Sequence, residues 1–237
     1  MQSIQPLPMQ QTFLVTGSAG FIGSHLCARL LSAGHRVIGL DNFDPFYSPS
    51  IKQRNLKPLR LYAEQFIEYN TDITDGELLK QVFLQWKGQI NQVIHLAAKA
   101  GVRPSLQNPQ AYVQTNVAGT LNVLECMRAI DCQRLVFASS SSVYGHMATP
   151  PFSEEMPVHR PMSPYAATKA MGENLLYTYS HLYNIQVALL RFFTVYGPAQ
   201  RPDLAIYKFT QAITNGHPIT LFGDGSTHRD YTYISDI

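Results

Sequence analysis

A glycine turn near the N-terminus is the feature that most restricts how this chain folds. Gly17, Gly20 and Gly23 follow the apolar run Phe13-Leu-Val-Thr16 and open an amphipathic stretch over residues 21–31. In a strand–turn–helix unit of this kind, backbone amides and the positive end of the helix bind the pyrophosphate of a dinucleotide. The spacing is Gly-x-x-Gly-x-x-Gly, whereas the more frequent fingerprint is Gly-x-Gly-x-x-Gly, so the turn alone is a modest signal. It predicts a dinucleotide site beside the first strand of a parallel sheet.

A tyrosine and a lysine four residues apart supply the second signal. Tyr165 and Lys169 lie in a segment of helical character, where this spacing puts both side chains on one face. An ammonium beside a phenol favours the phenolate, so such a tyrosine can act as a base near neutral pH. Pairs of this kind also occur by chance on solvated helix faces. Together with the glycine turn, the pair predicts redox chemistry between an alcohol and a ketone.

Strand-like and helical segments alternate along most of the chain. This alternation is typical of an α/β protein with a doubly wound parallel sheet, a Rossmann-type fold. The expected strands cover residues 13–16, 36–40, 66–69, 92–96, 134–138 and 186–192, and the expected helices cover residues 21–33, 51–60, 76–86, 109–130 and 164–183.

The alternation also predicts how the chain is divided. Residues 1–11 carry Gln and Pro without an apolar run, and we expect a disordered tail there. We expect residues 12–193 to form the dinucleotide-binding domain that carries the catalytic residues. The pattern weakens from about Thr194, and residues 194–237 are expected to be the start of a smaller, truncated substrate-binding domain.

Composition argues against several classes of partner. The 237 residues carry a net charge of +2 and no basic run, so we expect neither nucleic acid nor a membrane as a partner. No segment is long enough to span a bilayer, and the first residues do not resemble a signal peptide. Cys27, Cys126 and Cys132 have no metal-binding spacing, which predicts no metal site and a reducing, cytoplasmic location.

Asp41 is the residue that bears on the choice of cofactor. It ends the second expected strand, about 20 residues after the glycine turn, where a carboxylate accepts hydrogen bonds from the adenosine ribose hydroxyls. The same charge repels a 2′-phosphate, and Asn42 follows it instead of an arginine. This pattern favours NAD over NADP. The alternative is an aspartate that only caps a turn.

Both motifs, in this order and separation, resemble those of the extended short-chain dehydrogenases/reductases, the branch that contains the nucleotide-sugar epimerases and dehydratases. The resemblance runs from about residue 12 to the end of the chain. It implies NAD as cofactor, Tyr165 as base, Lys169 bound to the nicotinamide ribose, and Ser140 hydrogen-bonded to the reacting sugar hydroxyl. Asp72 is implied to contact the adenine, and its alternative role is to cap the helix that follows. The implied cofactor-binding residues, besides Tyr165 and Lys169, are Gly17, Gly20, Phe21, Ile22, Gly23, Asp41, Asn42, Asp72, Ile73, Leu96, Ala97 and Ala98.

A serine run narrows the resemblance. Ser139-Ser-Ser-Ser142-Val-Tyr-Gly145 lacks the acidic residues that dehydratases and decarboxylases of this branch carry before Val-Tyr-Gly. Such a run also occurs where hydroxyls only satisfy loop backbone groups. Together with Arg191-Phe-Phe-Thr194-Val-Tyr-Gly-Pro198, it resembles the UDP-glucuronate 4-epimerases most. The implied substrate-binding residues, besides Ser140 and Tyr165, are Arg103, Ser141, Ser142, Thr194, Arg201 and Arg229.

This resemblance implies an isomerase that interconverts UDP-glucuronate and UDP-galacturonate through a 4-keto sugar, for polysaccharide biosynthesis, as a homodimer. Lys99, where these epimerases usually carry Gln, departs from the pattern. One alternative is a 4-epimerase of the UDP-glucose/UDP-galactose type. The other is a catalytically silent, truncated NAD-binding module.

Overall fold

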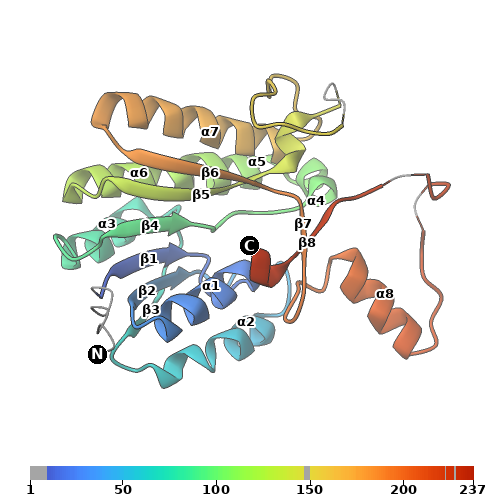
Figure 1. Cartoon of the computed structure of the whole chain (residues 1–237), viewed down its shortest axis with the longest axis horizontal. Helices are drawn as coiled ribbons and strands as arrows, with labels where there is room; N and C mark the ends of the chain where they lie inside the picture. Colours follow the sequence, from blue (N-terminus) through green and yellow to red (C-terminus); the bar gives the residue numbers. More distant parts are fainter. Residues whose placement is uncertain (1–9, 147–149, 222, 227) are drawn as a thin grey trace, which may run out of the picture.

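A six-stranded parallel sheet forms the centre of the protein in a computed structural model that describes residues 10–146, 150–221, 223–226 and 228–237. The spatial order is β3-β2-β1-β4-β5-β6, and all neighbours in it are parallel (Figure 1). The order reverses between β1 and β4, which confirms the predicted doubly wound sheet. The strands are β1 (Thr12–Thr16), β2 (Arg36–Asp41), β3 (Phe66–Asn70), β4 (Gln92–His95), β5 (Arg134–Ser140) and β6 (Gln186–Phe192).

Helices cover both faces of this sheet. Alternate residues of each strand point to opposite faces, so Leu14 and Ile38 pack with α3, α6 and α7, while Phe13 and Val37 pack with α1 and α2. The helices are α1 (Phe21–Ser32), α2 (Pro49–Leu56), α3 (Gly76–Gln85), α4 (Val102–Gln107), α5 (Pro109–Val113), α6 (Gly119–Ile130) and α7 (Pro164–Tyr183). Of these, α4 was not predicted.

The helix predicted over residues 109–130 is interrupted. A π-helical turn, Gln114–Ala118, separates α5 from α6. The turn carries Asn116, which is buried and accepts a hydrogen bond from the Lys99 N–H (2.8 Å). The Asn116 amide also donates to the Lys99 carbonyl and to Thr168 Oγ1 of α7 (3.0 Å each). The irregular turn therefore connects the loop after β4 to α7. Single π-turns inside α-helices are frequent at functional sites.

The last part of the chain forms a small separate sheet. Strands β7 (Thr194–Tyr196) and β8 (Tyr231–Tyr233) pair in parallel, and helix α8 (Ala205–Thr214), which was not predicted, lies between them in sequence. Of the predicted N-terminal tail, residues 1–9 lie outside the described residues, while the Gln11 carbonyl accepts a hydrogen bond from the Arg36 N–H (2.8 Å). The division at residue 193 stays a prediction.

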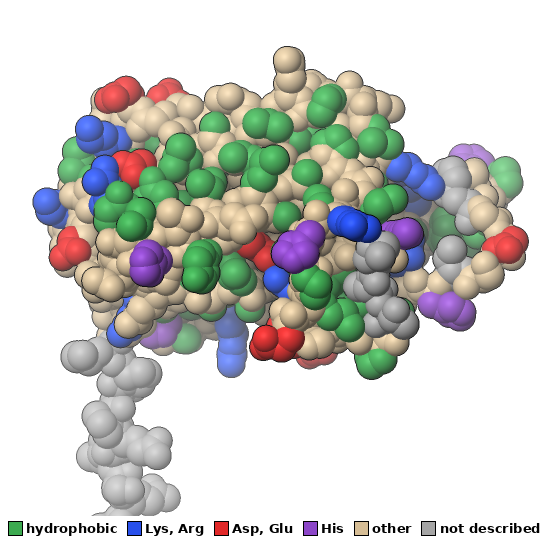
Figure 2. Space-filling view, turned by 90° about the horizontal axis from the view of Figure 1, so that it is seen from above, with side chains coloured by type: hydrophobic (Ala, Val, Ile, Leu, Met, Phe, Trp, Pro, Cys, Tyr) green, Lys and Arg blue, Asp and Glu red, His purple; other side chains and the backbone are tan. Residues whose placement is uncertain are grey.

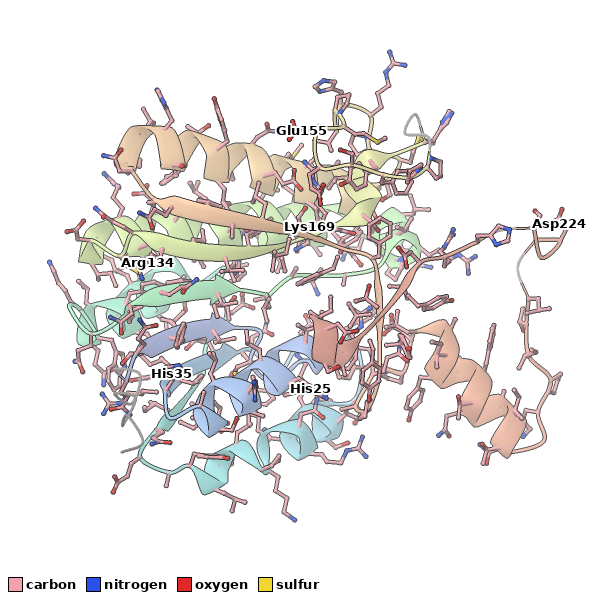
Figure 3. The ribbon with its side chains drawn as sticks, in the orientation of Figure 1. His25, His35, Arg134, Glu155, Lys169 and Asp224 are labelled. Atoms are coloured by element: carbon pink, nitrogen blue, oxygen red, sulfur yellow. The ribbon has the colours of Figure 1, made fainter. Side chains whose placement is uncertain are left out.

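The six parallel strands of the central sheet all begin on one side of the molecule and end on the other (Figure 1). Figure 3 shows His35 and Arg134 on the side where β2 and β5 begin, and Lys169 nearer the side where the strands end. Figure 2, which views the molecule from above relative to Figure 1, shows apolar side chains spread over this face. Among the residues of α7, the apolar Met171, Tyr177 and Leu182 are exposed. Among the described residues, no helix has the length and apolar character needed to cross a membrane.

His95 connects three elements of the core. The Thr16 hydroxyl accepts from the N–H groups of Leu96 and Ala97, so its own proton goes to His95 Nδ1 (2.6 Å). The other ring nitrogen, Nε2, is then the donor to Thr120 Oγ1 of α6 (3.0 Å). Burial, together with the charge of Lys169, lowers the pKa of His95 to about 3. Both nitrogens of this neutral imidazole are therefore used in packing β1, β4 and α6 together.

This burial predicts that the protein loses stability in mild acid. The pKa of His95 is held below the value of 6.5 that it has in the unfolded chain. The unfolded state therefore binds one proton more between these pH values, and the contribution of His95 is complete above pH 6.5 and falls as the pH decreases. Below pH 6.5, we expect the free energy of unfolding to decrease by about 1.4 kcal/mol for each pH unit. Urea unfolding at several pH values measures it. His95→Gln should make the free energy of unfolding less dependent on pH in this range, whereas His181→Gln, at an exposed control position, should not. An unchanged pH dependence in His95→Gln would contradict the role given to His95.

Candidate active site

The glycine turn forms a cradle in which side chains do not fit. Gly17 has a φ of +73°, and a Cβ there would lie 2.9 Å from the Ala97 nitrogen. A Cβ on Gly23 would lie 2.1 Å from the Gly17 carbonyl oxygen. Gly20 is the N-cap of α1 and supplies no side-chain cap, and the first turn of α1 has no acidic residue. The amides at this helix start are thus suited to a bound anion, as the pyrophosphate of a dinucleotide requires.

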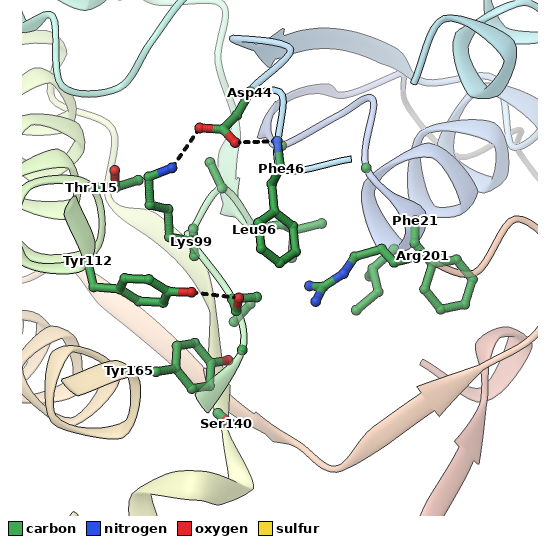
Figure 4. A pocket seen from close by; sticks show the side chains of 18 of the residues that line it. Phe21, Asp44, Phe46, Leu96, Lys99, Tyr112, Thr115, Ser140, Tyr165 and Arg201 are labelled. Carbon is green, nitrogen blue, oxygen red and sulfur yellow. Dashed lines mark hydrogen bonds and ion pairs between the residues drawn. The ribbon is translucent and has the colours of Figure 1, made fainter. Parts of the chain in front are cut away.

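A cavity of about 700 Å³ extends from this cradle to the carboxyl end of β5 (Figure 4). Its size is within the range of ligand pockets. Three predicted site residues, Asp72, Arg103 and Arg229, do not line it. All the others do: Gly17, Gly20, Phe21, Ile22, Gly23, Asp41, Asn42, Ile73, Leu96, Ala97, Ala98, Ser140, Ser141, Ser142, Tyr165, Lys169, Thr194 and Arg201.

Asp41 lies buried at the end of β2 with several partners. Its Oδ2 accepts from the Ala19 N–H (3.1 Å), and its Oδ1 accepts from the Phe43 N–H (2.8 Å) and from Lys52 Nζ (2.9 Å). An ionised carboxylate has about four acceptor positions, so one remains for a ribose hydroxyl. The predicted turn-capping role and the predicted ribose contact are thus compatible. The Lys52 ion pair was not predicted, because no local pattern links the two positions.

Asp72 is hydrogen-bonded to the cavity residue Asn42 and to Thr74. Its Oδ2 accepts from Asn42 Nδ2 (2.7 Å), and its Oδ1 accepts from the N–H and hydroxyl of Thr74 (2.8 Å each). The alternative role of Asp72 as a helix cap is wrong. The N-cap of α3 is Asp75, whose Oδ1 accepts from the Leu78 N–H (3.0 Å), because it lies directly before the first helical residue.

The predicted catalytic residues meet at the end of β5. The N-cap Ser163 accepts from the Ala166 N–H (3.1 Å) and starts α7 just before Tyr165. The Tyr165 phenol is hydrogen-bonded to Ser140, and Lys169 Nζ donates to the Ala138 carbonyl (2.7 Å). Sequence reasoning thus selected side chains that the fold brings together from β5 and α7.

The electrostatics of this group are less simple than the spacing suggests. Burial raises the pKa of the Tyr165 phenol, and the hydrogen bond from Ser140 and the charge of Arg201 offset only part of that rise. Burial also lowers the pKa of Lys169 to about 8, although the charge of Glu173 acts in the opposite direction. The cation whose charge lowers the pKa of the Tyr165 phenol is Arg201. An effect of Lys169 on the phenol stays a prediction.

Short hydroxyls and one arginine line the cavity beyond Ser140. Ser141 and Ser142 belong to a 3₁₀ turn after β5, and Thr194 begins β7. Arg201 forms a bidentate ion pair with Asp203 (2.9 and 2.6 Å), and its guanidinium lies 5.6 Å from the centre of the Phe46 ring. Its side chain is 22% exposed, so it is not a solvated loop arginine.

The two remaining predicted arginines lie elsewhere. Arg103 is exposed on α4, and Arg229 is exposed and donates to the His228 carbonyl (3.0 Å). Neither lines the cavity, and their substrate contacts stay predictions.

An ion pair that sequence reasoning missed spans the cavity wall. Lys99 Nζ lies 2.7 Å from Asp44 Oδ2 and joins the loop after β4 to the loop after β2 (Figure 4). Burial disfavours the ionised Asp44, but hydrogen bonds from Lys99 and the Phe46 N–H, with the nearby lysine charges, keep its pKa below the ordinary value. The only sequence signal was that Lys99 departs from the usual glutamine. In the part of the chain that the structure describes, no group of His, Cys, Asp and Glu is placed to hold a metal ion.

A doubly wound sheet with a glycine cradle and a Ser–Tyr–Lys group at the strand ends defines the short-chain dehydrogenase/reductase class. Residues 13–237 match the profile of the NAD dependent epimerase/dehydratase family, and the chain belongs to this family.

Relatives of this chain carry more specific names. The chain is 48% identical over 225 residues to a UDP-glucuronate 4-epimerase of Thermodesulfobacterium geofontis, which covers 95% of this chain and 68% of that protein. It is 46% identical to Protein CapI of Staphylococcus aureus, covering 94% and 66%, and 46% identical to UDP-glucuronate 4-epimerase 4 of Arabidopsis thaliana, covering 95% and 52%. The chain thus spans about two thirds of the length of these bacterial relatives and about half of the plant relative.

A solved structure matches over the same region. It is the crystal structure of UDP-glucuronic acid 4-epimerase from Bacillus cereus in complex with UDP-glucuronic acid and NAD. The TM-score is 0.88 at 39% sequence identity, over 95% of this chain and 70% of that chain.

Proposed function

We propose that this protein is an NAD-dependent 4-epimerase of UDP-glucuronate. The observation that carries the proposal is the continuous cavity that joins the glycine cradle to Ser140, Tyr165 and Lys169 and then to short hydroxyls and Arg201. The names of the relatives and of the solved structure support the same activity.

The residues of the cradle fit NAD. The amides at the start of α1 would hold the pyrophosphate, Asp41 the adenosine ribose, and Lys169 the nicotinamide ribose. The remaining residues proposed to line the cofactor are Phe21, Ile22, Asn42, Ile73, Leu96, Ala97 and Ala98, with Asp72 holding Asn42 in place. When bound there, NAD supplies the acceptor and later the donor of a hydride.

Replacing Asp41 with alanine should shift cofactor preference from NAD towards NADP. The substitution removes a ribose acceptor for NAD, whereas for NADP it also removes a repulsive charge and leaves the Lys52 ammonium unpaired near the 2′-phosphate. A hydrogen bond to a charged group contributes about 1.5–3 kcal/mol, so the ratio of the two Kd values should change about tenfold or more. Titration of the protein with both nucleotides measures it. Asp75→Ala, which removes only a helix cap, is the matched control; an unchanged preference in Asp41→Ala means that the carboxylate is structural.

The chemistry proposed for the chain concerns one proton at a sugar hydroxyl. Tyr165 would take the proton from the 4-hydroxyl, and Ser140 would orient that hydroxyl. The 4-keto sugar then turns within the cavity, and Tyr165 returns the proton after the opposite face of carbon 4 is reduced. The configuration at carbon 4 is inverted, and no reductant is consumed.

A carboxylate on carbon 5 adds a requirement. The 4-keto sugar is then a β-keto acid, which loses carbon dioxide when the breaking bond aligns with the carbonyl π system. Ser141, Ser142 and Thr194 are short hydroxyls that can bind the carboxylate without moving protons, and Arg201 can add charge-assisted donors. We propose that these four residues hold the carboxylate out of alignment.

Removing these hydroxyls should produce a slower epimerase that releases carbon dioxide. We expect this of Thr194→Ala and of the double replacement of Ser141 and Ser142 by alanine. A neutral hydrogen bond contributes about 0.5–1.5 kcal/mol, which is enough to raise a minor rotamer several-fold without abolishing binding. The assay is incubation with UDP-glucuronate and NAD, followed by analysis for pentose products. Thr115→Ala, which removes a hydroxyl from the wall near Lys99, should release none; wild-type behaviour of the other variants contradicts the carboxylate assignment.

The domain organisation, two arginines and the assembly of the protein also belong to the proposed function. We propose that residues 12–193 form the nucleotide-binding domain, that residues 194–237 start the substrate-binding domain, and that Arg103 and Arg229 contact the substrate. A homodimer packed through α5, α6 and α7 would cover the apolar surface of α7. A cytoplasmic location fits the three buried free cysteines.

Product analysis tests the proposed function directly. The purified protein is incubated with NAD and either UDP-glucuronate or UDP-glucose, and the products are separated by chromatography. Formation of UDP-galacturonate from UDP-glucuronate is the expected result. Turnover of UDP-glucose alone would instead identify a neutral-hexose epimerase, and NAD binding without turnover of either sugar would identify a silent NAD-binding module.

A further inference from the structure

Helix α7 is attached to the end of β5 by three side chains spaced one turn apart. Tyr165 is hydrogen-bonded to Ser140, and Lys169 Nζ donates to the Ala138 carbonyl (2.7 Å). One turn further along, the Ser139 hydroxyl donates to the carboxylate of Glu173 in a short hydrogen bond. Three consecutive residues of β5 are thus each bound by one residue of a single face of α7.

Glu173 is bound from a second strand as well. Arg191 of β6 donates to it through Nη2 (2.8 Å to Oε2) and Nε (3.1 Å to Oε1). Arg191 is the register partner of Ser139, so both donors reach Glu173 from adjacent positions of neighbouring strands. The guanidinium is also held by the Glu154 carbonyl (3.1 Å) and lies 5.0 Å from the centre of the Tyr144 ring. Glu173 is thus a buried carboxylate paired with Arg191 of β6, and Lys169 precedes it by one turn on the same face of α7.

We propose that Glu173 is a positioning residue of the candidate active site: its carboxylate, paired with Arg191 and one helical turn from Lys169, keeps the buried Lys169 side chain charged and directed at the end of β5. The inference rests on the proposed function in taking Lys169 as a catalytic residue. Glu173 does not line the cavity and takes no part in the chemistry itself.

The surroundings of Lys169 explain why it needs this partner. The side chain is 4% exposed, and its ammonium lies 5.0 Å from the centre of the Phe137 ring. From β4 it is faced by His95, which is neutral, and the Tyr165 phenol lies one turn earlier on its own helix. The cation on β6 that is bound to Glu173 is Arg191. Among the described residues of these elements, Glu173 is the negative charge that opposes the effect of burial on the pKa of Lys169.

This arrangement predicts opposite effects for two substitutions. Glu173→Gln leaves Lys169 and Arg191 without a counter-charge, so the pKa of Lys169 should fall. Arg191→Met removes the competing cation and leaves the Glu173 charge to Lys169 alone, so the pKa of Lys169 should rise. Damage to packing would not produce shifts of opposite sign, because both substitutions disturb the same contact between α7 and the sheet.

The test is an NMR titration of the protein labelled at lysine Cε and Nζ. The chain has seven lysines, and Lys169→Met identifies the signal. We expect a shift of about one pH unit or more downward in Glu173→Gln and upward in Arg191→Met. Ser139→Ala, which keeps the carboxylate, should shift the pKa little. Glu125→Gln, at a second glutamate that contacts α7 through Tyr179, should not shift it.

Shifts in the same direction for Glu173→Gln and Arg191→Met, or no shift in either, would overturn the inference. If Glu173→Gln does not fold, the sign of the shift in Arg191→Met decides alone, since a fall or no change contradicts the inference. The readout does not need turnover. Expected shifts in a protein without epimerase activity would contradict the proposed function and leave the role of Glu173 in place.

Discussion

Replacing Tyr165 with phenylalanine should lower the rate of epimerisation by a factor of about 10² to 10⁴, the usual effect of removing a positioned general base. Only the hydroxyl that is hydrogen-bonded to Ser140 is lost. The ring keeps its edge-on contact with Tyr112, whose centroid lies 6.2 Å away, so the cavity wall should keep its shape. NAD binding should therefore change little. The rate is measured from UDP-galacturonate formation, and binding is measured by titration with NAD.

A second tyrosine on the same helix provides the control. Tyr179 donates its hydroxyl to Glu125 of α6, and neither residue lines the cavity. Tyr179→Phe also removes one hydrogen-bonded, part-buried hydroxyl from α7, and it should keep most of the activity. Near-normal turnover by Tyr165→Phe would remove Tyr165 from the chemistry.

Replacing Gly23 with alanine should nearly abolish NAD binding and strongly destabilise the fold. The added Cβ would lie 2.1 Å from the Gly17 carbonyl oxygen and 2.9 Å from its carbon, so the cradle must open to admit it. Overpacking of this kind costs about 1–3 kcal/mol and occasionally more, and we expect the upper end because the obstacle is backbone. A loss of about 3 kcal/mol in NAD binding corresponds to a more than 100-fold weaker Kd. Urea unfolding and NAD titration measure the two effects.

Gly76 is the matched control for this substitution. It begins α3, and a Cβ there meets only Asn122 at 3.5 Å, an ordinary contact. Gly76→Ala should leave NAD binding unchanged and, because alanine favours helix over glycine, should keep or slightly increase stability. Normal NAD binding by Gly23→Ala would show that the cradle does not hold the pyrophosphate.

The central strands of the sheet, such as β1 and β2, were predictable because they are buried. Strands of a parallel sheet covered on both faces read as continuous apolar runs, and Phe13–Thr16 and Arg36–Leu40 were placed within one residue of β1 and β2. The glycine turn then located the cofactor end, because Gly23 approaches the Gly17 carbonyl too closely for a residue with a Cβ. Helix α8, in contrast, buries none of its residues, and the π-turn at Asn116 lies in a segment whose apolar pattern is that of one long helix.

The sequence predicted which residues form the candidate site, but it did not predict most of the contacts between them. Ser140, Tyr165 and Lys169 were found through local motifs. The ion pairs of Asp41 with Lys52 and of Asp44 with Lys99 join separate loops, and no local pattern specifies such partners. The spacing of Tyr165 and Lys169 alone did not predict the pKa of the tyrosine. Burial raises this pKa although a lysine lies one turn away.

In the proposed reaction, carbon 4 of the sugar is oxidised and then reduced again while the sugar stays in the cavity. The most direct measurement uses UDP-glucuronate carrying deuterium at carbon 4, with mass spectrometry and NMR of the UDP-galacturonate that forms in ordinary water. If the hydrogen of carbon 4 leaves and returns as a hydride within the site formed by Ser140, Tyr165 and the glycine cradle, the product keeps the deuterium at carbon 4. Loss of the deuterium to the solvent would contradict this account.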